Sequence, residues 1–259
     1  MQNVRLNSKV LFLQAINFII VLFSVSYVTS TGEYYWYGLS FIMWFLYCPI
    51  GVGLVLHRFL THKSFKTYKW IETILIILTV FSTVGPSLAW VALHRIHHKH
   101  SDTNKDPHTC YINGKFSFLQ ALKVIVGYLQ KIDNVPVKFI SDLLRNPIHK
   151  FIFNHYFKII FVWVIFLGII NPLLIVFAYA VPASLTIIVV GLVNVLGHSH
   201  GYVSHATADK STNSWIANII SFGEGWHNNH HANQHFPTTR EQWWEWDVIG
   251  IIIKFIEIK

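Results

Sequence analysis

Four long and nearly uncharged apolar runs limit what this chain can fold into more than any other feature of its sequence. Each run is close to the ~20 residues that an α-helix needs to cross the hydrocarbon core of a bilayer. Charged residues make up 12% of the chain, against about 25% in a typical soluble domain, which is too little to cover a water-facing surface. We therefore expect an all-α integral membrane protein, a single domain of residues 1–259 with four transmembrane helices. The expected spans are about 11–30, 34–56, 151–170 and 173–197.

A fifth apolar run, from Trp70 to Trp90, differs from the other four because Glu72 and the pair Gly85-Pro86 interrupt it. An acidic residue is costly at the centre of a bilayer, and a Gly-Pro pair favours a break in a helix. We expect this run to be a re-entrant or interfacial segment.

Basic residues concentrate between residues 57 and 150, whereas the short links near 31–33 and 171–172 carry no Lys or Arg. The positive-inside rule then places both termini in the cytoplasm, together with a helical cap formed by residues of about 57–150 and 198–259. The same rule accounts for the net charge of +8 without a nucleic-acid partner.

Nine of the sixteen histidines fall into ordered groups at the ends of the apolar runs. In an α-helix, residues i, i+3 and i+4 share one face, so each HxxHH motif is expected to point its three imidazoles at one spot. The residues of an HxxxxH pair are about 140° apart around an α-helix, so this pair fits best where a helix ends. The groups are an HxxxxH (His57, His62), two HxxHH motifs (His94, His97, His98 and His227, His230, His231) and a single His198 at the end of the last expected span.

These histidines predict a di-metal site in the cap. Neutral imidazole is the commonest protein ligand for a transition metal, and eight or nine of them exceed the roughly four to six positions of one ion. A given HxxHH pattern would occur by chance about 0.06 times in such a chain. Because the first two motifs can share a site only on one side of the membrane, the Trp70–Trp90 run cannot be a simple span. The remaining histidines are interpreted as surface, interfacial or outer residues: His100, His108, His149, His155, His200, His205 and His235.

The motifs closely resemble those of the membrane fatty-acid desaturase family, and in particular its Δ9 branch, for which the HxxxxH spacing is typical. The run from His94 to His108 resembles the family's second histidine box with its Asp-Pro-His tail, and Gly223-Glu-Gly-Trp-His-Asn-Asn-His-His231 resembles the third. The element Asn194-Val-Leu-Gly-His198 is similar to the one that supplies a ninth histidine ligand. The similarity runs from about Tyr34 to Trp246.

The resemblance implies a fatty-acyl desaturase that uses O2 and two electrons to introduce a cis double bond, here Δ9, into a saturated acyl chain. A redox metal suits this reaction because an unactivated C–H bond offers no acid–base handle. No catalytic residues are implied beyond the metal ligands. Asn194 is implied to hold a metal-bound water, and Asp102, Asp106 and Glu224 are candidate acceptors for imidazole N–H groups. The implied ligands of two iron ions are His57, His62, His94, His97, His98, His198, His227, His230 and His231.

The implied partners are O2, membrane lipids, an acyl chain carried by coenzyme A, a lipid or an acyl carrier protein, and an electron donor. Animal acyl-CoA members carry an Arg-Asp pair directly before the second box, where this chain has Ala92-Leu93, as in bacterial and cyanobacterial members. The chain has no HPGG motif of the cytochrome b5 type, which favours a separate donor of the ferredoxin or cytochrome b5 type. Arg95 and Lys99 flank the second box and are candidates for contact with a phosphate or with the donor. The closing stretch Ile249–Lys259 is expected to be an interfacial helix.

Two other classes of function stay open at this point. A histidine-box lipid hydroxylase, ketolase or alkane monooxygenase shares the metal chemistry but inserts oxygen. The HxxxxH spacing and the GEGWHNNHH run favour desaturation, and product analysis separates the two. A membrane transporter or metal-handling protein would place ionisable groups within its spans, whereas these motifs lie at the ends of the apolar runs.

Overall fold

The computed structural model describes residues 6–127 and 136–258, and these are mostly helical. Residues 1–5, 128–135 and Lys259, which belong to the expected N-terminal flank, cap and closing helix, lie outside the described residues. The α-helices are α1 (Leu6–Thr31), α2 (Tyr35–Phe45), α3 (Lys69–Leu78), α4 (Ser87–His100), α5 (Phe118–Ile125), α6 (Pro147–Ile170), α7 (Pro172–Leu174), α8 (Val181–Gly197), α9 (Trp215–Ser221), α10 (His227–Ala232) and α11 (Val248–Ile256). The other elements are the π-helices η1 (Leu46–Thr61) and η5 (Ile175–Ala180), the 3-10 helices η2 (Thr79–Ser82), η3 (Val137–Phe139) and η4 (Leu143–Arg145), and the antiparallel strands β1 (Tyr111–Ile112) and β2 (Lys115–Phe116).

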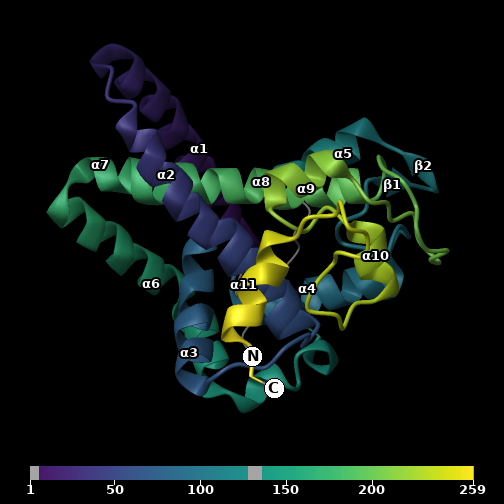
Figure 1. Ribbon diagram of the computed structural model, residues 1–259. Coiled ribbons are helices and arrows are strands. Elements are labelled where there is room, and N and C mark those ends of the chain that lie inside the picture. Colours follow the sequence, from purple (N-terminus) through teal and green to yellow (C-terminus); the bar gives the residue numbers. More distant parts are fainter. Residues whose placement is uncertain (1–5, 128–135, 259) are drawn as a thin grey trace.

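Within these residues, four continuous helical segments are long and apolar enough to cross a membrane, in agreement with the four expected spans. Their bounds are Lys9–Thr31, Tyr35–Thr61, Pro147–Ile170 and Pro172–Gly197. In the second and fourth segments 67% of the most apolar window is buried, against 22% in the first and third. The second and fourth segments therefore form an inner pair, while α1 and α6 are outer helices. Figure 1 shows that the α1–α2 turn and the α6–α7 turn both lie away from α10 and α11.

The fifth apolar run is bent and does not form one straight helix. The axis of α3–η2 meets that of α4 at 82°. Between them, Thr83 has a φ of +57° and Gly85 a φ of +105°, and the latter is a conformation that glycine adopts readily. The backbone N–H of Gly85 donates to the hydroxyl of Tyr156 at 3.1 Å. The break expected at Gly85-Pro86 is confirmed, and the chain turns back there so that α4 packs against η1.

The inner pair of helices is locked together where proline interrupts its backbone. Pro182 has no N–H to donate to the carbonyl of residue 177 or 178. The hydroxyl of Ser40 donates to the carbonyl of Phe177 at 2.7 Å, and the hydroxyl of Tyr47 donates to that of Ala178 at 2.9 Å. Side chains of the neighbouring helix therefore satisfy carbonyls that water cannot reach in a bilayer.

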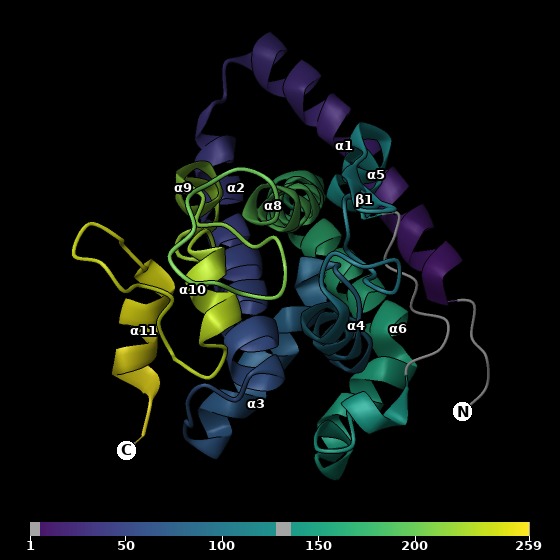
Figure 2. The ribbon, with the colours of Figure 1, turned by 90° about the vertical axis from the view of Figure 1, so that its right-hand side faces the viewer.

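The segments outside the four long helices pack around one end of the inner pair (Figure 2). α5 lies so close to α8 that a Cβ atom at Gly191 would come within 2.4 Å of the Cα of Ile125. α11 packs on η1 through its buried residues Ile249 and Ile253, while Phe255 is exposed on its other face. This two-sided character suits the expected interfacial helix, whose position at a membrane surface stays a prediction.

Candidate metal centre

The structure brings all nine candidate ligand histidines into two neighbouring groups. Within each group, one ring nitrogen of every histidine lies within 4.8 Å of those of the others. The residues come from η1, α4, the end of α8, and α10, so four regions that are distant in the sequence meet here. The first group contains His57, His62, His94, His98 and His230, and the second contains His97, His198, His227 and His231.

The HxxxxH pair reaches a single group because η1 is a π-helix. The backbone N–H of His62 donates to the carbonyl of His57 at 3.2 Å, which is the i to i−5 bond of a π-helix. Five residues are then little more than one turn, and the two ring centroids lie 4.9 Å apart. The angle of about 140° expected for an α-helix does not apply, although η1 does end just before His62, as expected.

Each HxxHH motif is divided between the two groups, so the expectation that its three imidazoles share one spot is wrong. On α4, His94 and His98 belong to the first group and His97 to the second. On α10 the division is reversed, because only His230 belongs to the first group. Residues i and i+4 differ by about 40° around an α-helix, whereas i+3 lies about 60° to the other side. A helix that lies between two metal centres can therefore supply histidine ligands to both of them.

The closest contacts in the second group join ring nitrogens that protons alone cannot satisfy. Each Nδ1 of His198 and His231 donates to a carboxylate, so each Nε2 of a neutral ring carries a lone pair. Both Nε2 atoms lie 3.1 Å from the Nε2 of His227, which has at most one proton to donate. Among the described residues, the Nε2 atoms of His62 and His97 are buried without a hydrogen-bond partner. Converging lone pairs of this kind repel one another unless a cation lies between them.

The spacing of the ring nitrogens in the first group also indicates a bound cation. Two nitrogens that are each about 2.1 Å from one ion lie ~3.0–3.4 Å apart in octahedral or tetrahedral coordination. The residues present therefore fit a transition-metal ion in each group. The measured Nε2–Nε2 distances are 2.9 Å for His57 and His230, 3.0 Å for His94 and His98, and 3.2 Å for His98 and His230.

Burial keeps six of the nine candidate ligand rings in the neutral form that can bind a metal. Burial, assisted by the repulsion between neighbouring imidazoles, lowers the pKa well below 6.5 for several of them. Burial also lowers the pKa of His231 to about 3, although Asp209 opposes the shift. At neutral pH these six rings therefore each offer a lone pair. The five rings whose pKa lies well below 6.5 are those of His62, His94, His98, His227 and His230.

The three carboxylates expected to hold imidazole N–H groups all contact candidate ligands. A carboxylate on Nδ1 fixes both the tautomer and the orientation of the ring. Burial raises the pKa of Asp106, but the attraction of His97 outweighs it and brings this pKa down to about 2. The pairs are Asp106 with His97 at 2.9 Å, Asp102 with His198 at 3.0 Å, and Glu224 with His57.

A fourth carboxylate, Asp209, was not found by reasoning from the sequence. It accepts from Nδ1 of His231 at 2.7 Å and so completes the same arrangement in the second group. The loop before α9 brings it there, and no spacing from any histidine motif indicates it. One signal was available, since Asp209 is the only acidic residue between His198 and Glu224.

Behind Glu224 lies a buried guanidinium, that of Arg58, which the sequence reasoning also missed. Its Nε donates to Glu224 at 2.9 Å, and its Nη1 donates to Asp247 at 2.7 Å. Burial raises the pKa of Glu224, but the attraction of Arg58 and His57 lowers it to about 2. Asp247 also accepts from the backbone N–H of Gly250 at 2.8 Å, as the N-cap of α11. Arg58 therefore connects the first histidine motif to the C-terminal helix.

The two asparagines within the third motif hold α10 in place. The Oδ1 of Asn228 accepts from the backbone N–H groups of Ser204 and His205, both at 2.8 Å. The Nδ2 of Asn229 donates to the fully buried Glu245 at 3.0 Å. These bonds tie α10 to the loop that precedes it and to the segment that follows it.

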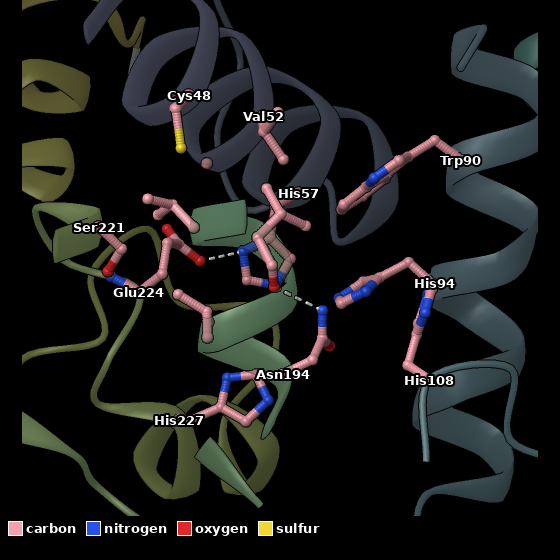
Figure 3. A pocket seen from close by; sticks show the side chains of 14 residues that line it. Cys48, Val52, His57, Trp90, His94, His108, Asn194, Ser221, Glu224 and His227 are labelled. Carbon is pink, nitrogen blue, oxygen red and sulfur yellow. Dashed lines mark hydrogen bonds and ion pairs between the residues drawn. The ribbon is translucent and has the colours of Figure 1, made fainter. Parts of the chain in front are cut away.

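A cavity between η1, α4, α8 and α9 reaches both histidine groups, and Figure 3 shows the side chains that line it. It is partly open to solvent, and its empty space, with that open part included, is about 550 Å³. Trp90 forms part of its wall and stacks on the ring of His94, with centroids 4.8 Å apart. Binding sites for hydrocarbon are largely apolar with a few polar groups. The apolar lining is Cys48, Val52, Val189, Val190 and Val193, and the polar lining includes His57, His94, His108, Asn194, Glu224 and His227.

The sequence matches the family model described as fatty acid desaturase over residues 34–242, which include every candidate ligand. The chain belongs to the fatty acid desaturase family. This desaturase is 31% identical to an sn-1 stearoyl-lipid 9-desaturase of Anabaena variabilis, over 90% of this chain and 85% of the other. It is 33% identical to an sn-1 stearoyl-lipid 9-desaturase of Synechocystis sp., over 85% and 69%. It is also 30% identical to an acyl-CoA C20 Delta5-desaturase of Anemone leveillei, over 89% and 74%.

In this membrane desaturase, an oxidoreductase by its family, Arg95 has a structural role, and its contact with a phosphate or donor stays a prediction. Its guanidinium donates to the carbonyl of Leu60 at 2.8 Å and forms a bidentate ion pair with Asp142, with N–O distances of 2.8 and 3.0 Å. It thereby fixes the end of η1, next to His62. Lys99 is exposed, and its role as a donor contact stays a prediction.

Asn194 of the desaturase lines the cavity beside His227. Its Nδ2 donates to the carbonyl of Val190 at 2.9 Å, drawn as a dashed line in Figure 3. This bond orients the amide and leaves Oδ1 as the atom that can accept from a bound water.

Proposed function

We propose that this desaturase introduces a cis double bond, at Δ9, into a saturated acyl chain at a di-iron centre held by its nine clustered histidines. The observation that carries the proposal is the partly apolar cavity that reaches both groups of converging ring nitrogens. No side chain can oxidise an unactivated methylene by acid–base chemistry. Iron bound in the two groups would supply the redox chemistry for this oxidation, with dioxygen and two electrons.

The proposed ligand set assigns one ion to each group. His57, His62, His94, His98 and His230 would hold the first, and His97, His198, His227 and His231 the second, with Asn194 holding a water beside it. The unpartnered Nε2 atoms and the short nitrogen–nitrogen distances support this assignment. Iron rather than zinc is proposed from the family, because imidazole ligands suit both metals.

The chain's own residues then do the binding and orienting. The apolar lining residues Val52, Val189 and Val193 would hold the hydrocarbon in the cavity that His57 and His94 also line. Asp102, Asp106, Asp209 and Glu224 keep the proton of each partner ring on Nδ1, so that Nε2 stays turned toward the centre of its group. The packing of Trp90 on His94 limits the access of water to that side of the cavity.

We propose a membrane lipid as the carrier of the acyl chain. Leu93, one of the two residues that replace the Arg-Asp pair of animal acyl-CoA members, packs against the cluster of Val10 and Ala89. The position therefore offers apolar surface and no charge to a nucleotide. Two of the relatives described above are named as stearoyl-lipid 9-desaturases, whereas a third is named as an acyl-CoA enzyme. The carrier is thus a separate point for experiment.

The proposed topology has the cap, the metal centre and both termini on the cytoplasmic side. The concentration of Lys and Arg between residues 57 and 150 supports it, as does an even number of candidate spans. A separate electron donor of the ferredoxin or cytochrome b5 type would then reach the centre from the cytoplasm.

The test is a fatty-acid profile by gas chromatography–mass spectrometry in a desaturase-deficient host that expresses the chain with its electron donor. The double variant His94→Ala/His230→Ala removes two ligands of the first group. The matched control is His155→Ala, whose ring lies outside both groups and, among the described residues, hydrogen-bonds only within its own helix. We expect a cis Δ9 monoene from the wild type and the control and none from the double variant, with iron content falling in parallel.

Two further readouts separate the alternatives. Hydroxylated or ketone lipids in place of the monoene would move the chain to the oxygen-inserting relatives. Membranes given labelled stearoyl-phosphatidylcholine or stearoyl-CoA, with reacylation blocked, identify the carrier, because only the true carrier will acquire the double bond directly. No new product from an iron-loaded enzyme with an active donor would refute the proposal.

A further inference from the structure

A second large hollow lies on the surface of the cap and shares no lining residue with the acyl cavity. It is bounded by the end of η1, the first turn of α3, η4 and the first turn of α6. Its floor is apolar, with Phe59, Phe65 and Leu143, while its rim is charged. We call it the basic cleft. It contains about 1390 Å³ of empty space, a volume that includes open solvent at its mouth.

Positive charge in the basic cleft exceeds negative charge. The lining holds Lys63, Lys66, Lys69 and Arg145 but only two carboxylates, those of Glu72 and Asp142. Among residues 6–127 and 136–258, neither Lys66 nor Arg145 forms an ion pair with a carboxylate. Two exposed cations therefore face the cleft without a neutralising partner.

The two carboxylates are already engaged, so they do not neutralise these cations. Asp142 holds Arg95 through both of its oxygens, and the attraction of Arg95 and Lys63 keeps its pKa well below the usual range although burial opposes this shift. Glu72 accepts from Lys69 at 3.0 Å and from Asn146 at 3.2 Å.

The position of the basic cleft matches the headgroup level of a membrane. It lies where η1, the second candidate span, ends and where α6, the third, begins. Tyr68 and Trp70, at the start of α3, are largely exposed, and these two residue types concentrate at membrane–water interfaces. Just beyond the exposed residues Thr73 and Lys150, Ile74 of α3 and Phe151 of α6 expose apolar side chains. This placement depends on the proposed membrane orientation and not on the desaturase reaction.

We propose that the basic cleft binds the phosphate of an anionic phospholipid headgroup. Basic pockets between the ends of membrane helices on the cytoplasmic side bind such headgroups. Arg145 offers a planar fork of donors that matches phosphate oxygens, and Lys66 offers a mobile point charge. Because the cleft includes Phe59 and Leu60, which follow His57 in η1, a bound lipid would also support the first histidine motif from outside.

The test is calorimetric titration of the detergent-solubilised chain with short-chain phosphatidylglycerol, with phosphatidylcholine and inorganic phosphate as separate probes. The double variant Lys66→Gln/Arg145→Gln removes the two unneutralised cations. Its matched control, Lys105→Gln/Lys115→Gln, removes two exposed cations outside the cleft. Each basic residue near an anionic headgroup contributes about fivefold in affinity, so the double variant should bind phosphatidylglycerol roughly 30-fold more weakly while the control binds like the wild type.

A second variant, Thr73→Trp, fills the basic cleft from α3 without changing its charge and should also weaken binding. It decides the question if the charge variant does not fold. Equal binding of phosphatidylglycerol by Lys66→Gln/Arg145→Gln and by its control would overturn the proposal. Displacement of phosphatidylglycerol by an equal concentration of inorganic phosphate would replace a lipid headgroup by free phosphate as the ligand. Equal affinity for phosphatidylcholine would overturn the requirement for net negative charge.

Discussion

Replacing Glu224 by Gln tests whether the carboxylate behind His57 controls metal binding. Glu224 accepts from Nδ1 of His57 and from Nε and Nη2 of Arg58, the last two at 2.9 Å. An amide has one acceptor oxygen, so in Glu224→Gln its NH2 group must face either the imidazole N–H or the guanidinium. One hydrogen bond to a charged group is lost, at about 1.5–3 kcal/mol. Loss of an outer partner of a metal-bound imidazole typically lowers metal affinity 10–100-fold, or about 1.4–2.7 kcal/mol, which agrees with that figure.

The assay is iron(II) affinity by competition with a chelator, together with the number of irons per chain. The control is Glu241→Gln, which removes the same charge from an ion pair with His205 and contacts no candidate ligand. We expect the iron affinity of the first group to fall 10–100-fold in Glu224→Gln and to stay unchanged in the control. Wild-type affinity in both variants would show that Glu224 does not orient His57.

Three further predictions follow from other parts of the structure. As the pH falls from 7.5 to 5.5, the metal-free chain should lose stability, because its buried histidines stay neutral while those of the unfolded chain, with an ordinary pKa near 6.5, take up protons; a thermal midpoint that rises instead would contradict this. Val193→Trp fills the apolar side of the cavity and should abolish product while both irons stay bound, and iron loss would place Val193 in a structural role. Ser40→Ala/Tyr47→Phe removes the two hydroxyls that satisfy the carbonyls before Pro182 and should lower the free energy of unfolding by about 2–4 kcal/mol; an unchanged thermal midpoint would argue that another group replaces them.

The sequence was sufficient to predict which residues gather in the centre, because candidate metal ligands occur as short local motifs. His94, His97 and His98 are recognisable from spacing alone, and the span count followed from hydropathy. The break at Gly85-Pro86 was also predictable, since both the residue types and the need to bring the first two motifs together required it.

The allocation of ligands to groups was not predictable, because it depends on where α4 and α10 lie relative to each other. The helical wheel alone led to the wrong expectation of one spot for each HxxHH motif. The roles of Asp209, as the partner of His231, and of Arg58 depend on contacts between segments distant in the sequence, and no local sequence pattern predicts such contacts. The π-helical register of η1, a helix that contains Pro49, likewise had no recognised sequence signal.

The division of each HxxHH motif has a consequence for the spacing of the two nitrogen groups. Since α4 supplies both groups, and α10 also supplies both, their separation is set by the rise and rotation of two helices and not by loops. Because α4 and α10 are rigid helices that each contact both centres, they keep the two centres at one distance even if other parts of the cap move. A single residue inserted into either motif would therefore do more than remove one ligand. It would reassign imidazoles from one centre to the other and change both coordination spheres at once.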